Sequence, residues 1–187
     1  MDRYIDLTIL PDPEFQATVL MSALFSKLHK ALVAEGSRQI GVSFPRVEEE
    51  AVGMGPVLRV HGSAGNLESL MSLNWLLGMR DHTRLSEIEP VPPKTMHRIV
   101  RRVQAKSNPE RLRRRLAKRK NISLEQAREL IPETAAQRLT LPFVSLRSAS
   151  TGRSFRLFIE HLPLEPEPKT GEFSLYGLSS TATVPWF

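Results

Sequence analysis

Residues 4–36 decide how the fold begins and read YIDLTILPDPEFQATVLMSALFSKLHKALVAEG. Between 4 and 10, polar and apolar residues alternate, and this period of two predicts a strand with one buried face. From 13 to 35 the apolar spacing becomes three or four residues, which predicts a long helix that ends at Gly36. The apolar stripe of this helix consists of Leu20, Leu24, Leu28 and Ala31.

Residues 37–88 carry four further predicted elements. Strands are expected at 39–44, 57–61 and 83–88, and a second helix at 67–77. The resulting order, β-α-β-β-α-β, is that of a ferredoxin-like domain, in which two helices cover one face of a four-stranded antiparallel sheet. We therefore expect an α+β fold.

A proline-rich segment follows and reads EPVPP over residues 89–93. Three prolines within four residues disfavour a helix or a central strand, so this segment is predicted to be a linker. We expect a ferredoxin-like domain at 1–94 and a smaller α+β domain at 95–187. The pattern in the second domain predicts strands at 96–104, 143–148, 154–161 and 173–178, an arginine-rich helix, and a short helix that opens with a capping box at 123–126 and stops at Pro132.

Positive charge is concentrated in one part of the chain. Residues 98–120 contain eleven Lys or Arg and a single acid, Glu110, whereas the rest of the chain contains fifteen bases and nineteen acids. A basic block of this density attracts a polyanion, and nucleic acid is the commonest one. A solvated helix face and a segment that binds acidic lipids are the two alternative interpretations.

The centre of this block reads SNPERLRRRLAKRK over residues 107–120 and has the features of a well-capped helix. At 100° per residue, five basic side chains fall on one face: Arg111, Arg114, Arg115, Lys118 and Arg119. Leu112 and Leu116 lie beside that face and are predicted to anchor the helix. Arginine binds phosphate through two parallel hydrogen bonds and reads guanine edges. A helix would enter RNA only where the narrow A-form groove is widened, as at a loop or stem end.

The composition also bears on several other classes of protein. Cysteine is absent, so disulfides and thiolate metal sites are excluded. No two of the five histidines share a short metal-ligand spacing, and no phosphate-binding glycine loop occurs. The N-terminus does not resemble a signal peptide, and no apolar run approaches the roughly 20 residues of a membrane span. We therefore expect a cytoplasmic protein with no metal, no cofactor and no membrane partner.

Several stretches resemble the CRISPR repeat endoribonucleases of subtype I-F systems. The longest is RRVQAKSNPERLRRRL at 101–116, and the resemblance extends over the whole length of the chain. The shorter stretches are PDPEF at 11–15, KLH at 27–29, LRSASTG at 146–152, FRLFI at 155–159, YGL at 176–178 and VPWF at 184–187.

The resemblance implies a fold and a reaction. Members of the family have an N-terminal ferredoxin-like domain and a smaller C-terminal domain that carries the arginine helix. They bind the stem-loop of a CRISPR repeat and cut at the base of its stem without metal. The 2′-hydroxyl attacks the adjacent phosphate and leaves a 2′,3′-cyclic phosphate and a 5′-hydroxyl. The enzyme then stays bound to the mature guide RNA, together with the other subunits of a surveillance complex.

The resemblance also implies three catalytic residues in this chain. His29 corresponds to the base that activates the 2′-hydroxyl, and imidazole suits this role because its ordinary pKa of about 6.5 lies near operating pH. Ser148 corresponds to the residue that holds the nucleophile, and Tyr176 to a tyrosine that orients the histidine or the substrate. No spacing in the sequence itself singles out His29, which a helix pattern alone would assign to a structural role.

The RNA-binding residues implied by the resemblance fall into three sets. Arg102 and Gln104 match a pair that reads guanine and adenine edges low in the stem, and Phe155 matches an aromatic residue that stacks on the closing base pair. Ser150 and Thr151 match positions that contact RNA near the cut. The groove-lining set consists of Arg114, Arg115 and Arg119, with Arg111 on the same face. Lys118 and Lys120 depart from the family, which is richer in arginine there.

Two other functions remain open from the sequence. The same helix and sheet could hold a stem-loop without cutting it, and the retention of His29, Ser148 and Tyr176 favours the enzyme over this binding protein. Binding of duplex DNA is a weaker alternative. It predicts that the protein binds DNA through the basic helix about as tightly as it binds RNA.

Overall fold

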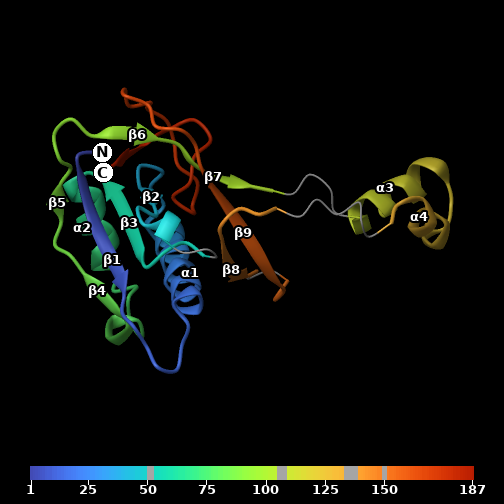
Figure 1. The fold of residues 1–187 in the computed structure, drawn as a ribbon, viewed down its shortest axis with the longest axis horizontal. Helices are drawn as coiled ribbons and strands as arrows, with labels where there is room; N and C mark the ends of the chain where they lie inside the picture. The colour runs from blue at the N-terminus through green and yellow to red at the C-terminus, as the bar shows by residue number, and fades with distance from the viewer. Residues whose placement is uncertain (50–52, 105–108, 133–138, 149–150) are drawn as a thin grey trace. The chain divides into compact units, whose positions relative to one another are not determined.

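The computed structural model describes residues 1–49, 53–104, 109–132, 139–148 and 151–187. The chain divides into two compact units, and each is described by itself (Figure 1). Unit 1 comprises Met1–Arg102 with Pro142–Phe187, and unit 2 comprises Val103–Leu141. Helices and antiparallel sheets both occur, so the predicted α+β class is confirmed. The domain boundary proposed near residue 94 stays a prediction.

The first six elements of unit 1 follow the predicted order. They are β1 (Arg3–Ile9), α1 (Ala17–Glu35), β2 (Gly41–Ser43), β3 (Val57–Gly62), α2 (Ala64–Ser72) and β4 (Thr83–Leu85). Two short 3₁₀ helices, η1 (Val47–Glu49) and η2 (Arg80–His82), lie in the connections. The sheet has the order β2-β3-β1-β4 and is antiparallel, with Ile5 of β1 opposite Val60 of β3. This order and the two intervening helices are those of the ferredoxin-like arrangement.

Several predicted boundaries in this half are wrong, among them the end of β4, which lies at Leu85 rather than residue 88. Helix α1 begins at Ala17 because the Asp12 carboxylate accepts the backbone N–H groups of Glu14 and Phe15, at 2.8 and 2.9 Å, and closes a turn before the helix. Helix α2 ends at Ser72 rather than residue 77. The predicted linker begins with a short strand, β5 (Glu89–Pro90), which pairs with Arg3 and Tyr4 at the start of β1.

The strand predicted at 96–104 is two strands in different sheets. β6 (Met96–Arg98) pairs with β10 (Val184–Trp186), whereas β7 (Val100–Val103) joins a second sheet. That sheet has the order β7-β9-β8 and contains β8 (Phe143–Arg147) and β9 (Ser154–His161). β8 and β9, predicted as strands at 143–148 and 154–161, pair with each other as an antiparallel hairpin.

The strand predicted at 173–178 is wrong, because these residues form a tight turn. The Gly177 N–H donates to the Ser174 carbonyl at 2.8 Å, and Gly177 has a φ of +69°. The turn is attached to the first sheet because the Val42 N–H donates to the Gly177 carbonyl at 2.9 Å. The left-handed glycine ends the alternating pattern that predicted a strand.

Helix α1 is the central core element of unit 1. Within the described ranges it is the one helix long and apolar enough to meet the length and composition criteria for a membrane span. Its apolar side chains instead pack into the protein core with both sheets, as expected for a core helix. The buried residues of α1 are Leu20, Met21, Leu24, Phe25, Leu28, Ala31 and Leu32.

Unit 2 contains the basic helix α3 (Pro109–Lys120) and the short helix α4 (Leu124–Leu130). Both helices and the capping box formed by Ser123 and Gln126 were predicted and are confirmed. Leu112 and Leu116 are half-buried, as expected for anchors. The most buried basic side chain is Arg113, at 4% exposure, whose Nε donates to the Ile131 carbonyl at 2.8 Å.

The buried histidines of unit 1 make its stability depend on pH. His161 packs against Phe44 and Trp186, and burial, aided by the charge of Arg98, lowers its pKa to about 4. Burial also lowers the pKa of His61. An unfolded histidine takes up a proton near pH 6.5, so unfolding becomes more favourable as the pH falls from 6.5 towards 4.

We expect His161→Phe, which keeps a ring but cannot titrate, to reduce this loss of stability. Wild type should lose about 1–2 kcal/mol more than the variant between pH 7.5 and pH 5, as measured by urea unfolding. An equal loss in both proteins would show that His161 is protonated in the folded state.

Candidate active site

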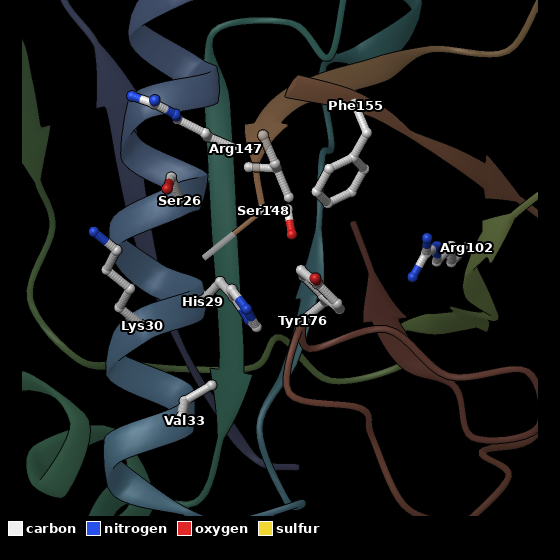
Figure 2. A pocket seen from close by; sticks show the side chains of 10 residues that line it. Ser26, His29, Lys30, Val33, Arg102, Arg147, Ser148, Phe155 and Tyr176 are labelled. Atoms are coloured by element: carbon white, nitrogen blue, oxygen red, sulfur yellow. The ribbon is translucent and has the colours of Figure 1, made fainter. Parts of the chain in front are cut away.

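A hollow of about 580 Å³ lies in unit 1, where α1, the end of β8, β9 and the turn at 174–177 meet (Figure 2). Three of its residues are those that the resemblance assigns to catalysis, and two more, Arg102 and Phe155, are among those that it assigns to binding the stem. The full lining is Ser26, His29, Lys30, Val33, Arg102, Leu146, Arg147, Ser148, Phe155 and Tyr176.

The orientation of the His29 ring is set by a backbone carbonyl. His29 lies on α1 and is half-buried, and its Nδ1 is 2.8 Å from the carbonyl oxygen of Leu175. A carbonyl oxygen only accepts hydrogen bonds, so Nδ1 carries the hydrogen in this contact. In the neutral ring Nε2 is then left with a lone pair, which can accept a proton. The tautomer is therefore the one that a general base requires.

Tyr176 fixes the plane of the same imidazole. Its ring stacks on His29 with a centroid separation of 4.0 Å and an interplanar angle of 13°. On the core side, Phe25 lies nearly parallel to Tyr176, at 6.4 Å and 3°. The stacked ring limits rotation of the imidazole about its side-chain bonds, while the Leu175 carbonyl selects its tautomer.

Both contacts to His29 come from adjacent residues of one turn, and that turn requires glycine at 177. A Cβ at Gly177 would lie 2.6 Å from Cγ1 of Val42, and the φ of +69° is unfavourable for other residues. The Ser174 hydroxyl oxygen accepts the N–H groups of Tyr176 and Leu178, both at 3.4 Å. The close contact with β2 thus determines where Leu175 and Tyr176 lie.

Ser148 is placed by the turn between β8 and β9. Its N–H donates to the Arg153 carbonyl at 2.9 Å, and its own carbonyl accepts the Gly152 N–H at 2.8 Å. The hydroxyl oxygen accepts the Thr151 N–H at 3.3 Å. Thr151 is exposed in this turn, whereas Ser150 lies outside the described residues. Figure 2 shows Ser148 beside His29 and Tyr176 at the centre of the hollow.

Arg102 and Phe155 lie on one side of these three residues (Figure 2). Arg102 projects from β7, with its Cζ 6.0 Å from the Phe155 ring centroid and 5.9 Å from that of Tyr176. These distances are at the outer limit of cation–π contact. Gln104, which directly follows β7, is exposed.

The basic stripe predicted on α3 is exposed to solvent, and Arg113 is directed to α4 instead. The helix thus presents a face of basic side chains to solvent. The exposed members are Arg111, Arg114, Arg115, Lys118 and Arg119.

Five pocket residues were not among the predicted site residues: Ser26, Lys30, Val33, Leu146 and Arg147. Ser26 lies three positions before His29 and Val33 four after it, so helical spacing around a known histidine could have found these two. Lys30 directly follows His29 in the sequence. Arg147 is adjacent in sequence to Ser148. In the described part of the chain, no three His, Cys, Asp or Glu side chains are grouped so that they could hold a metal ion.

Comparison with known proteins agrees with the resemblance seen in the sequence. The model of the family described as CRISPR-associated protein (Cas_Csy4) matches residues 4–187. A protein of Pseudomonas aeruginosa (strain UCBPP-PA14), named CRISPR-associated endonuclease Cas6/Csy4, is 54% identical over 187 residues, which cover 100% of both chains. A protein of the same name from Escherichia coli (strain UTI89 / UPEC) is 49% identical, with the same coverage. The chain therefore belongs to the Cas_Csy4 family of CRISPR-associated proteins.

Proposed function

We propose that this protein is an endoribonuclease that cuts CRISPR precursor RNA at the base of the repeat stem-loop without a metal ion. The relatives bear the name CRISPR-associated endonuclease, which supports the class of reaction. The observation that carries the proposal is the contact between His29 Nδ1 and the Leu175 carbonyl, because it leaves Nε2 as the proton acceptor inside the hollow.

The reaction we propose is an attack within the RNA chain. His29 Nε2 removes the proton of the 2′-hydroxyl, and that oxygen forms a bond to the adjacent phosphorus. The bond from phosphorus to the 5′-oxygen breaks, and the leaving oxygen takes a proton from the imidazolium or from water. The products are a 2′,3′-cyclic phosphate and a 5′-hydroxyl. General-base assistance of this kind contributes roughly 10²–10⁴-fold to the rate.

Ser148 and Tyr176 act on this geometry in different ways. In our proposal the Ser148 hydroxyl holds the nucleophilic 2′-hydroxyl near Nε2, and the fixed β8–β9 turn keeps its position. Tyr176 orients the imidazole by stacking. When the ring becomes positively charged, the face of the tyrosine also stabilises it, which favours proton removal.

The bound RNA would contact both units of the chain. Phe155 would stack on the closing base pair, worth about 1–3 kcal/mol on the usual scale for base–aromatic contacts. Arg102 and Gln104 would read base edges low in the stem, and Ser150 and Thr151 would contact RNA near the cut. The basic stripe on α3 would contact the groove of the stem through Arg111, Arg114, Arg115, Lys118 and Arg119.

After cleavage, the protein would keep the stem-loop of the mature guide RNA and join the other subunits of a subtype I-F surveillance complex in the cytoplasm. The exposed stripe on α3 supports retention, because several phosphate contacts made at once slow the release of RNA. Most of these positions are arginine, whose planar guanidinium makes paired hydrogen bonds to phosphates and base edges. This favours binding in the groove of a structured RNA over attraction by charge alone.

The proposed reaction makes a prediction about His29→Ala. We expect single-turnover cleavage of a repeat hairpin in EDTA to slow by at least about 100-fold, because Nε2 is lost, while the Kd for the hairpin changes little. Wild type should make one cut at the stem base and leave a 2′,3′-cyclic phosphate. His82→Ala is a matched control, because His82 is bonded to Asp12 outside the hollow.

Two results would contradict this account. Normal cleavage by His29→Ala would remove the histidine from the mechanism. Tight binding of the hairpin by wild type without any cut, in EDTA or in magnesium, would leave a protein that only holds the stem-loop.

The proposed RNA contacts make a prediction about the basic stripe on α3. Arg115→Ala and Arg119→Ala should each weaken hairpin binding and reduce the slope of log K against log salt by roughly 0.7–0.9, because each removes one phosphate contact. Lys120→Ala removes a charge from the opposite side of the same helix and should preserve the slope. If all three variants kept the wild-type slope, the stripe would be excluded as the phosphate-binding surface.

A further inference from the structure

A second hollow, of about 450 Å³, adjoins the candidate active site. It lies between α1 and β8, and two of its residues, Ser26 and Arg147, also line the first hollow. The two hollows therefore lie side by side and share part of their walls. We name the second hollow the α1–β8 groove, and its lining is Thr18, Val19, Ser22, Ala23, Ser26, Gly53, Phe143, Ser145 and Arg147.

Three small hydroxyl-bearing residues contribute to the α1 wall of this groove. Thr18, Ser22 and Ser26 are spaced by four residues, so they share one face of the helix. The Ser22 hydroxyl accepts the backbone N–H of Ser145 at 3.0 Å and thereby attaches α1 to the edge of β8. The wall is thus held in place, and it combines these hydroxyl groups with the apolar side chains of Val19 and Ala23.

The β8 wall ends at an aromatic ring with an arginine beside it. Phe143 is half-exposed and lies opposite Phe158 of β9, with a ring separation of 5.5 Å. The Arg156 Cζ lies 4.6 Å from the centroid of the Phe143 ring. Side chains alternate along a strand, so these residues are on the face opposite buried Val144 and Leu157. An aromatic ring and arginine on an outward sheet face are features of surfaces that bind single-stranded nucleic acid.

The position of Arg147 links this surface to the reaction centre. Its Nε donates to the Gly152 carbonyl at 2.9 Å, which holds the side chain at the junction of the two hollows. Figure 2 shows Arg147, Ser26 and Lys30 on the side of His29 opposite to Arg102 and Phe155. If the stem lies at Arg102 and Phe155, a strand that continues past His29 reaches the side of the hollow that Arg147 lines.

We propose that the α1–β8 groove binds the unpaired nucleotides that follow the cleavage site. Arg147 contacts a phosphate of this downstream strand, and one base stacks on Phe143 within reach of Arg156. The proposal rests on the proposed function, because that function places the stem and so gives the strand its direction. It adds a single-stranded element to a substrate otherwise recognised by its hairpin.

The experiment measures Kd for three RNAs with a 2′-deoxy sugar at the cleavage site, so that none can be cut by the proposed reaction. One is the hairpin ending at that site, one carries six further nucleotides downstream, and one carries six upstream. For wild type, the downstream nucleotides should tighten binding by about tenfold, the effect of stacking one base with a phosphate contact. The upstream nucleotides should add less.

Two variants test the groove through the ratio of Kd for the hairpin to Kd for the downstream-extended RNA. Arg156→Ala and Phe143→Leu should each reduce this ratio to below about threefold. Arg84→Ala, which removes an exposed arginine of β4, should keep the wild-type ratio. Arg156 is exposed, so Arg156→Ala tests the proposal even if Phe143→Leu disturbs the packing of β8 against β9.

The outcomes separate this proposal from the proposed function. If wild type binds none of the three RNAs, the proposed function fails, and this proposal fails with it. If the hairpin binds and the downstream nucleotides add nothing, or the gain survives in both variants, only the groove assignment is overturned. If the upstream nucleotides give the gain instead, the direction of the strand is overturned.

Discussion

The hydrogen bond between His29 Nδ1 and the Leu175 carbonyl is the contact on which the candidate site depends. It joins the core helix α1 to a turn that lies 146 residues later in the chain. The same turn supplies the Tyr176 ring that stacks on the imidazole. The turn is held against β2 because Gly177 has no Cβ to meet Val42. The reactivity we assign to His29 is therefore a consequence of how closely the turn and the first sheet pack.

Different elements of unit 1 position different residues of the candidate site. Helix α1 buries one face in the core and presents another face to the hollow. The packing of the buried face therefore fixes the position of His29 in the hollow. The β8–β9 hairpin supplies Ser148 from its turn and Phe155 from its inner face, and it shares the core with α1. Rigid sheets and a buried helix thus hold reactive groups that would be poorly positioned on isolated loops.

Sequence patterns predicted those elements whose signals are local. The stripe of α1, the bounds of α3 and the capping box at Ser123 depend on neighbours within four residues, and all three agree with the structure. The 173–178 segment was predicted to be a strand because its polar and apolar residues alternate, but its pairing with Val42 and the left-handed Gly177 close a turn. Likewise 96–104 divides between two sheets, because its partners lie near residues 160 and 185. His29 was recognised only through family resemblance, since its contact with Leu175 leaves no local pattern.

The central claim is the tautomer of His29, and it can be measured directly. Long-range ¹H–¹⁵N NMR of histidine-labelled protein, assigned by the signal missing in His29→Ala, distinguishes a protonated ring nitrogen from one with a lone pair. In the neutral ring we expect the hydrogen on Nδ1 and the lone pair on Nε2. A neutral ring with its hydrogen on Nε2 would contradict the account, because the nitrogen that faces the RNA could then not accept a proton.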